Sequence, residues 1–119
     1  MRKWLVCGLD DEHYSDATYS LHDTIDNAIE AAKANVTDCL GLDYDPEVSM
    51  ERDHEKLRVE YAGDTCFYVN VIIEISVNDG DFIGILHHAY DGIDFFVKVT
   101  CSREECLAKL KEECKALAD

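Results

Sequence analysis

One segment of the chain alternates its side chains more regularly than any other. Successive side chains of a β-strand point to opposite faces, so a period of two predicts a strand with one buried face. Over residues 66–77 every second side chain is large and apolar: Phe67, Val69, Val71, Ile73, Ile75 and Val77. The positions between them carry Tyr68, Asn70, Glu74 and Ser76, with Ile72 as the exception. This strand requires a sheet around it.

Other strands are predicted on both sides of this segment. Residues 3–9, 56–61 and 82–90 read as strands, and Phe95, Val97, Val99 and Cys101 line one face of a last strand. Turns are predicted at residues 78–81 and 91–92, because Asp-Gly supplies the positive φ that a tight turn needs. Residues 42–55 are predicted to form a charged loop.

Two helices are predicted from their start signals and apolar stripes. Ser20 is expected to cap the first helix, with Asp23 completing a capping-box pair and Gly41 at the C-terminal end. Ser102 and Glu105 form a capping box for the second helix. The expected buried stripes are Leu21, Ile25, Ala28, Ile29, Ala32, Val36 and Leu40 in the first helix, and Cys106, Leu107, Leu110, Cys114 and Leu117 in the second.

The predicted elements follow the order β-α-β-β-β-β-α. Short turns that contain glycine imply an antiparallel meander of the last four strands, and one polar strand face implies that both helices lie on the other. We therefore expect an α+β fold of two layers, with an antiparallel sheet and two helices packed on one face. With 119 residues, the chain is expected to form a single compact domain over residues 1–119.

The charge of the chain is strongly acidic and unevenly spread. It has 26 acidic and 11 basic residues, for a formal net charge of −15. Fourteen carboxylates and only two bases, Lys33 and Arg52, lie between Asp10 and Glu55, so this segment holds −12 of that charge. Such a surface repels nucleic acid and membranes and attracts basic proteins. We expect no direct nucleic-acid binding, no membrane association and a cytoplasmic location.

No cofactor, metal or catalytic site is predicted from a motif. The six cysteines include no C-x-x-C pair and are expected to be reduced. Asp43-x-Asp45-x-Glu47 resembles the start of a calcium loop, but the sixth position is Val48 and the twelfth is His54. There is no G-x-x-x-x-G-K phosphate loop. The chain is therefore expected not to be an enzyme.

One enzymatic hypothesis remains open and centres on His87 or His88. Either imidazole could act as a general base if Asp91 or Asp94 oriented it. Neighbouring residues of a strand point to opposite faces, which disfavours a shared site for the two rings.

The acidic segment is the strongest candidate for a binding site. Asp23, Asp26 and Glu30 are expected on the exposed side of the first helix, and further carboxylates precede and follow it. Tyrosines are interleaved with them, and tyrosine is favoured at interface hot spots. The predicted partner-binding residues are Asp10, Asp11, Glu12, Asp16, Asp23, Asp26, Glu30, Asp38, Asp43, Asp45, Glu47, Tyr14, Tyr19 and Tyr44.

In size, charge and lack of a catalytic motif, the chain resembles DNA-mimic anti-restriction and anti-CRISPR proteins of phages and mobile elements. The resemblance is one of type and carries no residue role with it. It implies a non-enzymatic inhibitor that blocks a basic, nucleic-acid-processing protein. Two alternatives stay open: an acidic face that only aids solubility, and a homodimeric regulatory module that associates through an edge strand or through the face bearing Tyr68, Asn70, Ile72 and Phe96.

Overall fold

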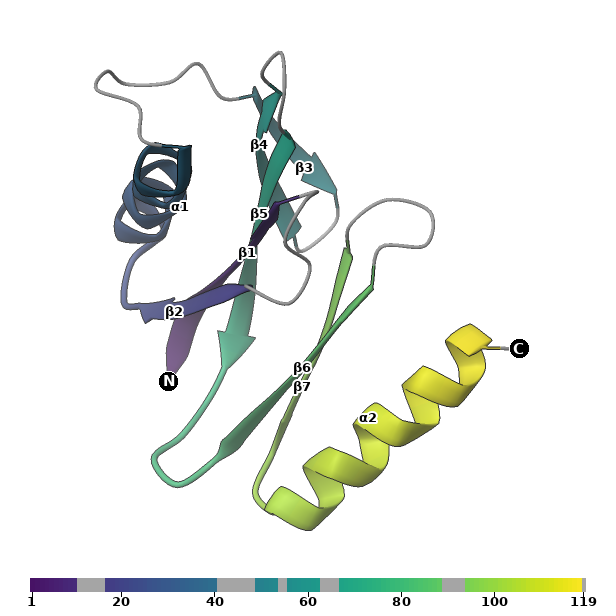
Figure 1. Ribbon diagram of the computed structural model, residues 1–119. Helices are drawn as coiled ribbons and strands as arrows, with labels where there is room; N and C mark the ends of the chain where they lie inside the picture. Colours follow the sequence, from purple (N-terminus) through teal and green to yellow (C-terminus); the bar gives the residue numbers. More distant parts are fainter. Residues whose placement is uncertain (11–16, 41–48, 54–55, 63–66, 89–93, 119) are drawn as a thin grey trace. The chain divides into compact units, whose positions relative to one another are not determined.

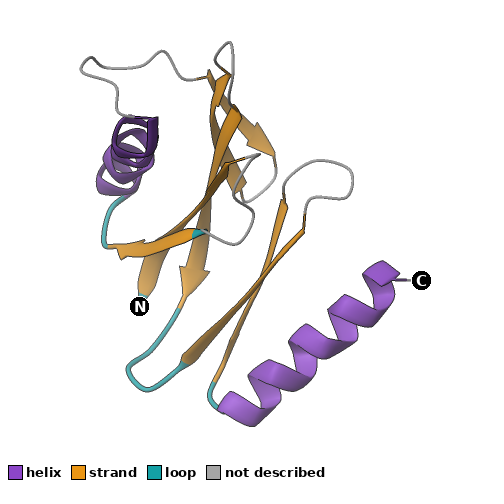
Figure 2. Cartoon of the chain, in the orientation of Figure 1, coloured by secondary structure: helices purple, strands orange, loops and turns teal. Residues whose placement is uncertain are grey.

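The computed structural model describes residues 1–10, 17–40, 49–53, 56–62, 67–88 and 94–118. Contacts divide the chain into two compact units, which are Arg2–Ile75 and Met1 together with Ser76–Asp119. Each unit combines one helix with a sheet of its own (Figures 1 and 2). The α+β class predicted from the sequence is confirmed, whereas the prediction of one domain stays a prediction.

The first unit is built on a five-stranded sheet. The strands lie in the order β2-β1-β5-β4-β3, and β1–β2, β3–β4 and β4–β5 pair in antiparallel fashion. Arg2 at the start of β1 forms an ion pair with Glu74 near the end of β5. The elements are β1 (Arg2–Asp10), β2 (Thr18–His22), α1 (Ile25–Leu40), β3 (Ser49–Asp53), β4 (Lys56–Ala62) and β5 (Phe67–Ser76).

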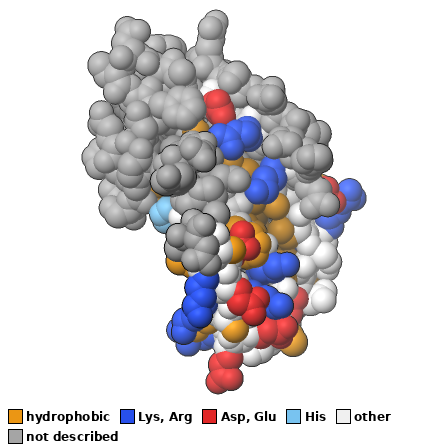
Figure 3. All heavy atoms as spheres, turned by 90° about the vertical axis from the view of Figure 1, so that its right-hand side faces the viewer, with side chains coloured by type: hydrophobic (Ala, Val, Ile, Leu, Met, Phe, Trp, Pro, Cys, Tyr) orange, Lys and Arg blue, Asp and Glu red, His pale blue; other side chains and the backbone are white. Residues whose placement is uncertain are grey.

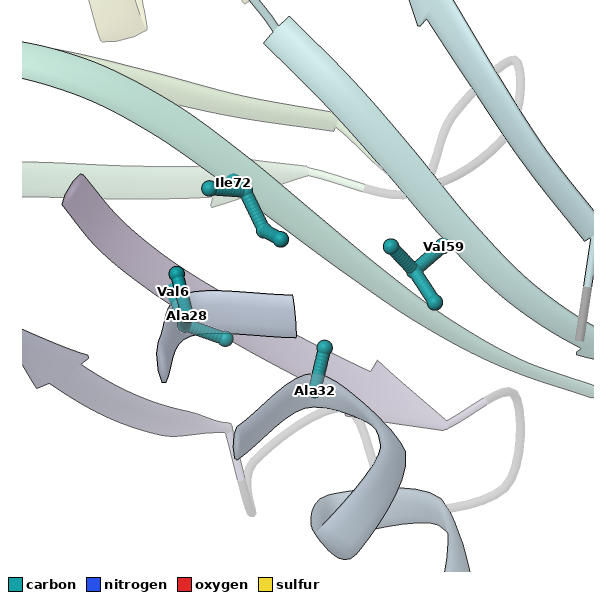
Figure 4. Close-up of a cluster of buried hydrophobic side chains, with 5 residues drawn as sticks. All are labelled: Val6, Ala28, Ala32, Val59 and Ile72. Atoms are coloured by element: carbon teal, nitrogen blue, oxygen red, sulfur yellow. The ribbon is translucent and has the colours of Figure 1, made fainter. Parts of the chain in front are cut away.

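The core under α1 is small and closely packed. Two alanines of α1, one turn apart, meet valine and isoleucine side chains from three strands (Figure 4). Small helix residues let the helix axis approach the sheet, and each buried Val or Ile contributes about 1.5–3 kcal/mol relative to exposure. The cluster consists of Val6, Ala28, Ala32, Val59 and Ile72.

The exception in the alternating strand is explained by this core. Ile72 is 2% exposed because it belongs to the cluster beneath α1, and Asn70 lies buried as well. Val69 and Val71, on the opposite face of β5, are also fully buried. The prediction that α1 packs on the Val69–Val71 face is therefore wrong, because β5 is covered by α1 on its other face.

The start of the first helix lies later than predicted. Ser20 and Leu21 belong to β2, which pairs with β1, so Ser20 is not the N-cap. Thr24 takes that role: the backbone N–H of Asn27 donates to its Oγ1 across 3.1 Å. Threonine is itself a good N-cap, and pairing with β1 holds the residues before it in a strand.

Residues 42–55, predicted as loop, contain a strand. Residues 49–53 form β3 and pair with β4, with Glu51 opposite Arg58 and Asp53 opposite Lys56. Charged residues weaken the period-two signal of a strand, although they are common on the end strand of a sheet. Residues 42–48 and 54–55 lie outside the described part of the chain.

The second unit is a two-stranded sheet with a helix. It contains β6 (Phe82–His88), β7 (Asp94–Thr100) and α2 (Arg103–Ala118). β6 and β7 are antiparallel and separate from the five-stranded sheet, so the four predicted meander strands divide into two pairs. Each helix accordingly packs on its own sheet rather than both on one face of a single sheet.

The predicted turn at residues 78–81 is confirmed. The N–H of Asp81 donates to the carbonyl of Asn78 across 3.0 Å, and Gly80 has φ 88°. The second Asp-Gly turn lies outside the described residues. The capping of α2 is also confirmed, since the N–H of Glu105 donates to Ser102 Oγ across 3.4 Å.

The packing of α2 differs in part from its predicted stripe. Cys106 is buried against β6, where a Cβ added at Gly84 would lie 2.4 Å from its Sγ. Leu107 and Cys114 were predicted to be buried, and both are exposed. A helix on a two-stranded sheet has room to bury only a narrow stripe.

Neither α1 nor α2, the helices of the described residues, has the length and apolar character needed to span a membrane.

Candidate partner-binding surface

The structure describes four of the predicted partner-binding side chains. Asp23, Asp26, Glu30 and Tyr19 are all exposed, and they lie on β2, on α1 and in the connection between them. Asp10 belongs to β1 and Asp38 to α1, but their side chains lie outside the described set. The remaining predicted residues are not among those described: Asp11, Glu12, Tyr14, Asp16, Asp43, Tyr44, Asp45 and Glu47.

Two carboxylates share the exposed face of α1. Asp26 and Glu30 are four residues apart, and so they lie about one helical turn apart. The buried residues Ala28 and Ala32 place the opposite face of the helix against the sheet. Like charges at this spacing repel by about 0.2–0.5 kcal/mol, while Asp26 in the first turn interacts favourably with the helix dipole.

Asp23 differs from these two because it has a basic partner. Lys3 of β1 donates a hydrogen bond to Asp23 Oδ1 and forms an ion pair with it. The hydrogen bond and the charge of Lys3 lower the pKa of the Asp23 carboxyl. Asp23 therefore stays ionised to a lower pH, but part of its charge is balanced within the molecule.

β2 exposes two apolar side chains, Tyr19 and Leu21, on the face of the sheet opposite α1. Tyr19 is 45% exposed and Leu21 43% exposed, although both are large and apolar. In the register with β1, Tyr19 lies opposite Cys7 and Leu21 opposite Leu5, so both lie on the face of the buried Leu5 and Cys7. Burial is the larger cause that raises the pKa of Tyr19, and the neighbouring Cys7 raises it further.

Leu21 is a site residue that sequence reasoning placed wrongly. It was predicted in the buried stripe of the first helix, and it is instead exposed on a strand. The signal that could have found it is the alternation Thr18-Tyr19-Ser20-Leu21-His22, in which polar and apolar side chains follow a period of two.

The other face of β2 carries a contact that the sequence did not reveal. Ser20 Oγ and His22 Nε2 lie 2.7 Å apart, both half-buried. Residues i and i+2 of a strand share a face, which brings the hydroxyl and the imidazole together. Covalent catalysis needs a nucleophile, a base and a group that orients the base. The pair supplies the first two kinds of group.

The predicted histidine site is only partly described. The ring of His87 packs against Phe95, with centroids 6.2 Å apart and planes tilted by 57°. The two residues lie opposite each other in the β6–β7 register. Asp91 and the side chains of His88 and Asp94 lie outside the described set, so the hypothesis of a His-dependent enzyme stays a prediction.

The proposed homodimer face is partly occupied by this chain itself. Asn70 and Ile72 are buried, Ile72 in the core under α1 and Asn70 in a hydrogen bond with Asn35 of that helix. These two side chains are therefore not a surface on which a second copy could dock. The side chain of Tyr68 lies outside the described set, and Phe96 is half-buried.

Charge is distributed differently on the two helices. α1 contains three acidic residues and one base, Lys33, whereas α2 contains four of each sign. Figure 3 shows acidic and basic side chains interspersed in its lower part. A mixed surface of this kind produces little net field, so the acidic excess belongs to the segment around α1.

The described cysteines include both buried and exposed thiols. Cys7 and Cys106 are buried, while Cys101 and Cys114 are exposed. Burial raises the pKa of Cys7 from 9.0 to about 12, which keeps the thiol protonated and unreactive at neutral pH. Among the described residues, no group of three or more His, Cys, Asp or Glu side chains could hold a metal ion.

Comparison with protein-family models, with curated proteins and with solved structures finds no match for this chain. The function of the protein is therefore inferred from the described residues themselves. The features that bear on it are the exposed carboxylates of α1, the ion-paired Asp23, and the exposed apolar residues of β2.

Proposed function

We propose that the protein is a non-enzymatic acidic inhibitor that binds a basic, nucleic-acid-processing protein and occupies the groove that this partner uses for phosphates. Asp26 and Glu30 are the observation that carries the proposal, because they lie side by side on the solvent face of α1. They belong to the segment that holds most of the acidic excess. A partner of this kind implies that the protein acts in the cytoplasm.

The spacing of these carboxylates suits the proposed role. Four residues of an α-helix rise about 6 Å. One strand of duplex DNA advances about 3.4 Å per phosphate, so two phosphate steps cover about 7 Å. A basic groove that contacts every second phosphate of a strand would therefore meet Asp26 and Glu30 at a similar interval. Electrostatic attraction of this kind speeds association and weakens as salt is added.

The test is an affinity purification with the full chain as bait, carried out at low and at high salt. The expected partner is a nucleic-acid-binding protein that is retained at about 0.01 M salt and released at about 1 M, where the Debye length falls from about 30 Å to about 3 Å. Binding that is independent of salt, or recovery of partners that do not handle nucleic acid, would contradict the proposal.

A pair of matched variants separates the α1 surface from acidity in general. Asp26→Asn with Glu30→Gln removes two exposed charges from α1, and Glu104→Gln with Glu105→Gln removes two exposed charges from α2. We expect the first variant to lose affinity for the purified partner and the second to retain it. Equal loss in both variants would mean that net charge, rather than this surface, determines binding.

A further inference from the structure

We infer that β2 is a docking strand, beside which an extended segment of the partner adds to the five-stranded sheet. The segment is expected to alternate apolar residues with Lys or Arg. This inference rests on the proposed function and identifies the element that holds the basic partner. It is carried by the position of β2, by its exposed side chains and by the charges next to it.

The position of β2 makes such an addition possible. Among the described strands, β2 lies at the end of the five-stranded sheet, with β1 as its neighbour. Leu5 and Cys7 of β1 are buried, and Leu21 and Tyr19 continue the same face outward onto β2, where they are exposed. The apolar layer of the sheet thus extends to β2, where Tyr19 and Leu21 are 45% and 43% exposed.

The two ends of the sheet differ in their chemistry. β3, at the far end, carries Glu51, Arg52 and Asp53 among its five residues. Charged residues on an end strand are a common protection against pairing with another chain. β2 has the sequence Thr-Tyr-Ser-Leu-His and contains no Asp, Glu, Lys or Arg. The end that lacks this protection is also the end that exposes apolar side chains.

Charge complementarity defines the occupant. Asp23 follows β2 directly, and Asp26 and Glu30 lie in the next turns of the chain, all exposed to solvent. When a peptide adds to a sheet, main-chain hydrogen bonds supply affinity and alternate side chains supply specificity. Apolar side chains of the segment would cover Tyr19 and Leu21. The basic side chains that alternate with them would point to the other face of the sheet, on which α1 and its carboxylates lie.

The experiment uses the full chain and two short synthetic peptides, one alternating Lys with Val and the other alternating Glu with Val. Affinity is measured by fluorescence anisotropy, and hydrogen exchange is followed at Thr18–His22. We expect only the Lys peptide to bind and to slow exchange in this strand. Leu21→Ser should weaken its binding by about tenfold or more, which corresponds to about 1.4 kcal/mol.

Leu107→Ser on α2 is the matched control, because Leu107 is 41% exposed and Leu21 is 43% exposed. Equal unfolding midpoints for wild type and both variants would show that each remains folded. We expect Leu107→Ser to bind the Lys peptide like wild type. If both serine variants weakened binding equally, general stickiness of exposed leucines would explain it, and the inference would be wrong.

Other outcomes separate this inference from the proposed function. If Asp26→Asn with Glu30→Gln weakens binding but Leu21→Ser does not, strand addition is wrong and the acidic inhibitor stands. If the Glu peptide binds as well as the Lys peptide, selection of a basic segment is wrong. If light scattering shows that the protein alone dimerises and that Leu21→Ser abolishes the dimer, the occupant of β2 is a second copy of this chain.

Discussion

Asn35 on α1 donates a hydrogen bond from its Nδ2 to Oδ1 of Asn70 on β5 across 2.9 Å. Asn70 is fully buried, and its own Nδ2 has no hydrogen-bond partner among the described residues. An apolar core tolerates small shifts of a helix along a sheet. A single buried polar pair favours one register of the helix on the sheet. In any other register, both the amide oxygen and the amide nitrogen of Asn70 would be without a partner.

Substituting Asn35 and Asn70 together should cost less free energy of unfolding than the sum of the two single substitutions. Asn35→Ala leaves the Asn70 amide without its partner and is expected to destabilise the fold by about 1–3 kcal/mol. Adding Asn70→Leu removes the buried polar group, so the double variant should recover most of this loss. Urea unfolding of the two single variants and the double variant measures the coupling. Simply additive free energies would contradict this account.

The N-cap of α1 can be tested at Thr24. Because Thr24 Oγ1 accepts the Asn27 N–H, Thr24→Ala should cost about 1 kcal/mol of stability. Thr24→Ser keeps the hydroxyl and should retain most of that stability. The free energy of unfolding from urea titration gives the comparison. Equal loss in both variants would assign the effect to the methyl group instead of the cap.

The close approach of α2 to β6 predicts a clash and its relief. The Cβ of Gly84→Ala would lie 2.4 Å from Cys106 Sγ and 3.0 Å from Leu110 Cδ1. The overpacked variant is expected to lose about 1–3 kcal/mol. The double variant Gly84→Ala with Cys106→Ala lacks this sulfur and should recover part of the lost stability. Thermal unfolding tests this, and a Gly84→Ala variant as stable as wild type would contradict the packing described.

Cys7 should make stability fall at alkaline pH. Its pKa is raised from 9.0 to about 12, so between these values the unfolded chain loses a proton that the folded protein keeps. Stability therefore falls as pH rises through this window, by about 1.4 kcal/mol per pH unit at most. Cys7→Ala should flatten this slope relative to wild type. Urea titrations across this window measure both slopes.

Lys3 is expected to determine how far the pKa of the Asp23 carboxyl is lowered. The lowered pKa of Asp23 means that its contribution to stability is present above its unfolded pKa and is lost as pH falls through the folded value. Lys3→Met is expected to raise the pKa of Asp23 toward its ordinary value of 3.8. Lys109→Met, on α2, is the control. Side-chain carboxyl NMR titration follows the shift, and an unchanged pKa in Lys3→Met would contradict the pairing.

The sequence predicted the elements whose patterns are strong and local. The stripe of Ala28, Ala32 and Val36 gave the first helix, and the alternation around Val71 gave the longest strand. The Asp-Gly turn at Gly80 was also predictable, because positive φ there requires a residue without a side chain to strain.

What the sequence did not predict depends on pairing between distant segments. Ser20 looks like an N-cap until β1 is known to pair with Thr18–His22, and the charged strand at Ser49–Asp53 forms only beside β4. The same lack of long-range information placed Leu21 in a helix, although it is exposed on an end strand. Of the candidate surface, the carboxylates and Tyr19 were predicted from the sequence, and the exposure of Leu21 was not.

The contact between Gly84 and Cys106 offers a way to recognise relatives of this chain. A glycine in the middle of β6 and a small residue facing it from the first turns of α2 must change together, because neither position can grow alone. Distant sequences that share little else could be tested for this pairing at the same spacing. Covariation there would trace the helix-on-hairpin unit across genomes.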